Sequence, residues 1–205
     1  MTQKELLDII YSVYPKIKWD EPNGHKYKNT IEHKRYKSIR AFRLNNYSKK
    51  LANLIKEQGY IIINENRSHD YCFKYTILCE RVNDIKDNDR QLLASLGGAR
   101  TDVYLYVSKI TKIFTMECEQ TQLKKINNQE EWTFQKTMFD GNAKEIFNTI
   151  YNYLTSSGLR FVNMNDLEVI VPDIETEYAD KGEATIFNLL FTPLHEHFTE
   201  KTIIL

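Results

Sequence analysis

Apolar side chains recur every three or four residues between positions 6 and 14, which is the spacing of one face of a helix. A Thr-x-x-Glu capping box precedes this stripe, and Pro15 follows it and ends the helix. The segment 30–43 allows a second helix, and a third apolar stripe ends at Gly59, a residue suited to a helix C-terminus. We therefore expect residues 1–59 to form a mostly helical N-terminal lobe.

The pattern changes to a period of two after residue 60, which is typical of strands. Alternating apolar residues predict strands over 71–79, 102–108 and 112–120, and a further strand is expected around residues 132–138. In the strand over 112–120 one face is apolar and the other carries Glu117 and Glu119. We expect that second face to be partly open to water.

The C-terminal third mixes both patterns. A helix is expected from Asp140 to Gly158, and the continuous apolar run 185–191 is expected to be a buried strand. Because no long helix separates the middle strands, their pairing should be antiparallel. The sequence predicts a single α+β domain over residues 1–205, with an antiparallel meander sheet of about five or six strands and packed helices in 60–205.

Composition excludes several classes of protein. The mean hydropathy is −0.53, and no run of 18 apolar residues could cross a membrane. The charged N-terminus does not resemble a secretory signal, so a cytoplasmic location is expected. The three cysteines, Cys72, Cys79 and Cys118, are expected to be reduced packing residues.

Charge is balanced overall but segregated along the chain. There are 28 basic and 28 acidic residues. Segment 26–50 has a surplus of eight positive charges, whereas segment 166–183 has a surplus of six negative charges. Such segregation directs the choice of partner rather than the fold. Two acidic groups are candidates for contact with a protein partner: Asp173, Glu175, Glu177 and Asp180 in the acidic segment, and Glu117 and Glu119 in the sheet.

Motifs for catalysis or metal binding are weak. The carboxylates Glu80, Glu117 and Glu119 could act in a hydrolase or nuclease if they converge in a cleft with a lysine or a metal. His195 and His197 would share one face of an extended segment, but zinc needs three or four ligands. Neither a Walker A loop nor a Gly-x-Gly-x-x-Gly motif is present. We expect no metal and no cofactor.

Segment 26–50 also interleaves cations with aromatic residues, a pattern suited to phosphates and unpaired bases. Against this, the calculated pI of the whole chain is about 7.0, whereas nucleic-acid-binding domains are usually strongly basic. This alternative function, an accessory protein that binds nucleic acid, assigns contacts to Lys34, Arg35, Lys37, Arg40 and Arg43.

The C-terminal third contains the most distinctive stretches, Val-Pro-Asp-Ile-Glu-Thr-Glu at 171–177 and Gly-Glu-Ala-Thr-Ile-Phe-Asn-Leu-Leu-Phe at 182–191. With Tyr14-Pro15 and the spacing from Glu32 to Tyr36, they resemble a loosely defined group of bacterial proteins of similar length. The resemblance covers about a quarter of the chain. It implies an immunity or accessory protein of a toxin system and carries no catalytic residue across.

This resemblance and the weak catalytic motifs favour a non-enzymatic binding protein. We expect an immunity protein that neutralises a cognate toxin domain by covering its surface. Such a protein needs a rigid, charged surface with aromatic anchors rather than an active site.

Overall fold

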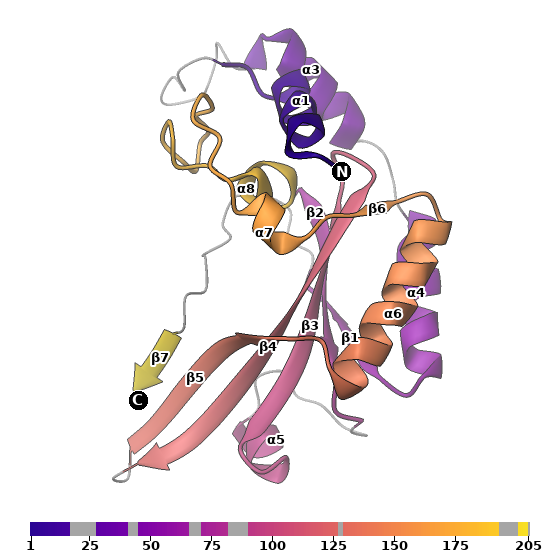
Figure 1. Cartoon of the computed structure of the whole chain (residues 1–205), viewed down its shortest axis with the longest axis vertical. Coiled ribbons are helices and arrows are strands. Elements are labelled where there is room, and N and C mark those ends of the chain that lie inside the picture. The colour runs from indigo at the N-terminus through magenta and orange to yellow at the C-terminus, as the bar shows by residue number, and fades with distance from the viewer. Residues whose placement is uncertain are drawn as a thin grey trace.

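The computed structural model describes residues 1–16, 28–40, 45–65, 71–81, 90–126, 129–192 and 201–204. A twisted sheet runs the length of the molecule (Figure 1). Its strands follow the order β1-β2-β3-β4-β5-β7, and β6 pairs with β4. The strands are β1 (Ile61–Asn64), β2 (Cys72–Leu78), β3 (Ala99–Ser108), β4 (Ile113–Ile126), β5 (Gln129–Thr137), β6 (Arg160–Phe161) and β7 (Lys201–Ile204).

The helices lie on both faces and at the ends of this sheet (Figure 1). Two of the helices are short: α5 precedes β3 in the chain, and α7 follows β6. The longest of the described helices is α6. The helices are α1 (Gln3–Val13), α3 (Ile31–Arg40), α4 (Asn45–Glu57), α5 (Arg90–Ser95), α6 (Gly141–Ser156), α7 (Met164–Leu167) and α8 (Ile186–Leu190).

One face of the sheet packs against α4 and α6. Odd-numbered residues of β3 and even-numbered residues of β4 lie on this face, as their cross-strand register shows. They form one apolar cluster with the inner sides of the two helices. This cluster includes Leu51, Ile55, Val103, Leu105, Met116, Cys118, Ile146 and Ile150. We call this side the apolar face.

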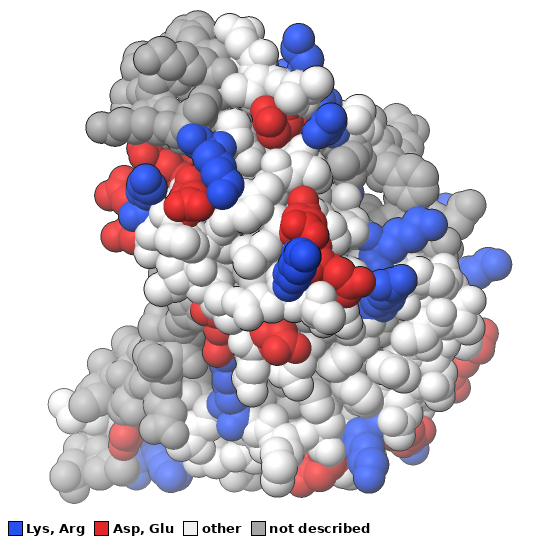
Figure 2. All heavy atoms as spheres, turned by 45° about the horizontal axis from the view of Figure 1, so that its top comes forward, with Lys and Arg blue, Asp and Glu red and all other residues white. Residues whose placement is uncertain are grey.

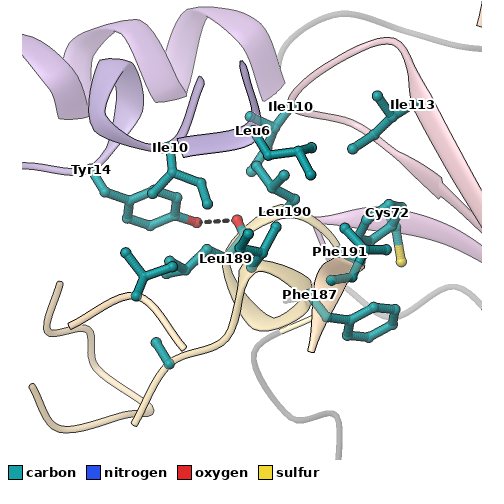
Figure 3. Packing of buried hydrophobic residues seen from close by; sticks show 14 of the residues in the cluster. Leu6, Ile10, Tyr14, Cys72, Ile110, Ile113, Phe187, Leu189, Leu190 and Phe191 are labelled. Carbon is teal, nitrogen blue, oxygen red and sulfur yellow. Dashed lines mark hydrogen bonds between the residues drawn. The ribbon is translucent and has the colours of Figure 1, made fainter. Parts of the chain in front are cut away.

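The opposite face packs at one end against α1 and α8, where a second apolar cluster forms (Figure 3). Leu6 and Ile10 of α1 meet Phe187 and Leu190 of α8 in this cluster. The Tyr14 hydroxyl donates a hydrogen bond to the Leu189 carbonyl at 2.8 Å, so the N-terminal lobe is fastened to the C-terminal part of the chain.

The α+β fold, its antiparallel sheet and its N-terminal helices are confirmed. Two details differ from expectation. β6 pairs with β4 in parallel. The run 185–191 is the helix α8 and not a strand, because Thr185 and Asn188 form a reciprocal capping arrangement at its start. A fully buried helix and a fully buried strand both appear in sequence as a continuous apolar run.

Candidate functional site

Most of the acidic segment 166–183 lies in the loop between α7 and α8. We call residues 169–185 the acidic loop. Its two ends are held together by backbone hydrogen bonds from Val171 to Ala184 and from Ile186 to Val169. Val171, Ile174 and Ala184 are fully buried in the cluster beneath α1. These contacts hold the loop in place from within.

Other side chains of the acidic loop are exposed. Glu177 and Asp180 are exposed, and Figure 2 shows acidic side chains gathered with a few basic ones at the upper left, where this loop lies. Lys16 contacts Asp173 at 3.0 Å and covers the ring of Tyr11 at 3.9 Å, which fixes the start of the loop to the segment after α1.

Exposed apolar side chains accompany these acids. Ile170 is 54% exposed and Tyr178 is 43% exposed, and they are two of the five large hydrophobic residues that are exposed in the described part of the chain. Buried anchors and exposed acids with an aromatic residue are therefore combined in one short loop.

The basic segment supplies a different surface on α3. Lys34, Arg35 and Lys37 are exposed, as expected for contacts with phosphates. Tyr36, however, is buried, and its ring packs against Tyr14 and Tyr71. This aromatic residue is used in the core and is not available to stack on a base.

The nucleic-acid hypothesis also assigns contacts to Arg40 and Arg43. The backbone of Arg40 belongs to α3, but nothing is described of its side chain. Arg43 lies outside the described residues, as do His195 and His197.

Glu117 and Glu119 lie on the second face of the sheet, but that face is not wet. The side chain of Glu117 is 11% exposed, and Glu119 as a residue is 7% exposed. Thr115 on the same face is fully buried. The expectation of a partly open face is wrong here, and this burial removes Glu119 from any open surface that could meet a partner.

Tyrosines from the neighbouring strand hold both glutamates. The Tyr106 hydroxyl donates to Glu117 Oε1 at 2.9 Å, and the Tyr104 hydroxyl donates to Glu119 Oε1 at 3.2 Å. In the β3–β4 register Tyr104 stands opposite Glu117, so each hydroxyl reaches a glutamate diagonally. Burial raises the pKa of both carboxyls, and the tyrosine hydrogen bonds act in the opposite direction.

A buried ion pair continues this row of polar groups. Arg100 Nε and Nη2 donate to Asp102 Oδ2 at 2.9 and 2.8 Å. Burial raises the pKa of Asp102 to about 7, although the Arg100 charge favours the ionised form. We call the row of Arg100, Asp102, Tyr104, Tyr106, Glu117 and Glu119 the polar band.

The sequence hypothesis missed four members of this band, Arg100, Asp102, Tyr104 and Tyr106. Their alternation with the apolar residues Val103 and Leu105 was the available clue, because it places all four on one face.

Glu80 lies beside the polar band. Its Oε1 accepts a hydrogen bond from the backbone N–H of Thr101 at 2.8 Å. Glu80, Asp102, Glu117 and Glu119 are thus each held by a donor within the protein.

Two further classes of site concern metal ions and membranes, taken over the residues that the structure describes. No group of three or more His, Cys, Asp or Glu side chains there is arranged to hold a metal ion. No helix in this part of the chain is both long and apolar enough to span a bilayer. The three cysteines are buried and unbonded to one another, and burial raises the pKa of Cys79 and Cys118.

No protein-family model, curated protein or solved structure matches this chain. The function proposed below therefore depends on the sequence and on the geometry described above.

Proposed function

We propose that this protein acts by binding another protein through the acidic loop, as a bacterial immunity protein that covers the surface of a cognate toxin. The observation that carries the proposal is the construction of the loop. Its base is buried and hydrogen-bonded, and its outer side presents acids together with Ile170 and Tyr178.

Preorganisation gives this loop an advantage as a binding surface. A loop that is already ordered loses less conformational entropy when a partner docks. Further contacts within the loop support this order: the Tyr178 N–H donates to Thr176 Oγ1 at 3.2 Å, and the Asp180 N–H donates to Glu183 Oε2 at 3.3 Å.

The chemistry of the loop specifies a basic partner. Exposed carboxylates attract a positively charged surface and accelerate encounter, and a tyrosine at the centre of the contact contributes affinity. A toxin domain that acts on nucleic acid has such a basic surface, because it must neutralise phosphates. Covering that surface would block the toxin without any chemical step.

Growth rescue tests the proposal directly. The protein is co-expressed with the toxin encoded beside its gene, and rescue of growth with a stable complex is expected. The variant Glu177→Lys/Asp180→Lys should weaken the complex by about 100-fold, mainly through slower association, and abolish rescue.

A matched control reverses two acids elsewhere on the molecule. Glu57→Lys/Glu131→Lys makes the same change in net charge on α4 and β5 and should leave affinity within about threefold of the parent. Equal affinity of both double variants would show that the acidic loop is not the contact. Absence of both rescue and complex would contradict the immunity function itself.

Nucleic-acid binding is the second candidate, and the three exposed cations of α3 favour it. Filter binding with a salt titration separates the two. A steep loss of affinity with salt that disappears in Lys34→Ala/Arg35→Ala/Lys37→Ala would support this candidate. A flat salt response would exclude it.

A further inference from the structure

Two acids face each other inside the sheet. Asp102 and Glu119 are directly opposite in the β3–β4 register, and both side chains lie on the face of the sheet that carries the polar band. Asp102 is fully buried and Glu119 nearly so. Like charges at opposite cross-strand positions destabilise a sheet, and burial strengthens their repulsion.

Asp102 is also incompletely satisfied. The two Arg100 nitrogens that contact Asp102, Nε and Nη2, both donate to the same oxygen, Oδ2. Oδ1 is buried and has no hydrogen-bond partner among the described residues. An ionised carboxylate with one bare, buried oxygen is costly, whereas a carboxylic acid needs only a nearby acceptor for its proton.

Charges of both signs surround the pair: Lys74 and Arg100 act on Glu119 as opposite charges, and Glu117 acts on it as a like charge. Glu80 and Glu119 both act on Asp102 as like charges, against the single guanidinium of Arg100. The groups that act on the pair from the surrounding elements are Lys74 of β2 and Glu80 after it, Arg100 and Tyr104 of β3, and Glu117 of β4. Beyond them, Glu65 pairs with Lys74 at 2.8 Å, and Lys136 of β5 contacts Glu168 at 2.9 Å and Glu117 at 3.7 Å.

We propose that Asp102 and Glu119 share one proton in the folded protein at neutral pH, so that the polar band is a proton-binding site. The proton comes from solvent during folding. It is bonded to one carboxyl, which donates a hydrogen bond to the other carboxyl. Oδ1 of Asp102 then takes part in a hydrogen bond with the Glu119 carboxyl, and one of the two opposed negative charges is removed. The raised pKa of Asp102, about 7, agrees with this geometry.

This site makes the fold sensitive to pH in the neutral range. When the shared proton leaves, two carboxylates stand opposite each other in a buried part of the sheet. We expect the β3–β4 pairing to loosen at that point, independently of whether the acidic loop binds a toxin.

Carbon-13 NMR titration of the side-chain carboxyls tests the site in the full-length protein. The Asp102 carboxyl should titrate with a midpoint near pH 7, and Asp102→Asn assigns its signal. Glu119→Gln should lower that midpoint by one unit or more, because the opposed charge is gone. Glu57→Gln, an exposed change on α4, should leave it unmoved.

Two results would overturn the proposal. A midpoint below pH 5 for Asp102 would mean that both carboxyls are ionised at neutral pH. A midpoint that stays near 7 in Glu119→Gln would mean that burial alone holds the proton and that the pair does not share it. Glu80→Gln provides a second comparison if Glu119→Gln does not fold, and it too should lower the Asp102 midpoint.

Discussion

The two faces of strands β3 and β4 are both buried, yet they are built from different chemistry. The apolar face packs Leu105 and Met116 against α4 and α6. The polar band, on the reverse of the same strands, consists of carboxyls held by tyrosines and an arginine. Burial by itself therefore does not tell how a face of the sheet stabilises the fold. The contribution of the apolar face depends on packing, and that of the polar band depends on the protonation of its acids.

The largest expected effect concerns the apolar face. Leu105→Ala removes a fully buried side chain and leaves a cavity, so the free energy of unfolding should fall by about 2–5 kcal/mol. Urea denaturation measures this loss, which should be the same at pH 5 and pH 8. If the fall in free energy of unfolding caused by Leu105→Ala grows with pH, the apolar face is not independent of the protonation of the acids on the other face.

A smaller effect is expected on the polar band. Tyr106→Phe keeps the ring against Phe187 but removes the hydroxyl that donates to Glu117. The free energy of unfolding should fall by about 1–3 kcal/mol, because the buried Glu117 carboxyl loses its donor. Tyr178→Phe, at an exposed position, is the control and should change little. A loss no larger than that of Tyr178→Phe would show that the Tyr106 hydroxyl does not support the band.

The sequence allowed most of the fold to be predicted because its periodicity is strong. The stripe over residues 6–14 and the alternation in 102–108 each correspond to an observed element. The run 185–191 is the exception, because five of its seven residues are apolar and such a run favours a buried strand as much as a buried helix. Its Thr185 and Asn188 were the local clue to a helix start.

The polar band was harder to predict, for a physical reason. Glutamates alternating with apolar residues normally mark the wet side of a strand, and the sequence does not show what covers that side. Glu117 and Glu119 are buried because tyrosines on β3 supply donors that offset the loss of water. That pairing depends on the β3–β4 register, which a single sequence leaves open.

The pH dependence of stability follows from the raised pKa of Asp102. In the unfolded chain an aspartate titrates near 3.9, roughly three units below the folded value of about 7. Between these values the folded protein binds more protons than the unfolded one. The stabilisation is therefore complete below about pH 4 and is lost as the pH rises through 7, with a slope of at most about 1.4 kcal/mol per pH unit. His33, whose pKa is lowered by burial, contributes the opposite trend in both parent and variant.

The most direct measurement compares the free energy of unfolding of the parent and of Asp102→Asn between pH 5 and pH 8, by urea denaturation. The contribution of His33 cancels in the difference between the two proteins. We predict that the advantage of the parent shrinks by about 1 kcal/mol for each pH unit up to 7. If the difference in free energy of unfolding between the two proteins stays constant from pH 5 to pH 8, the claim that the polar band holds a proton is contradicted.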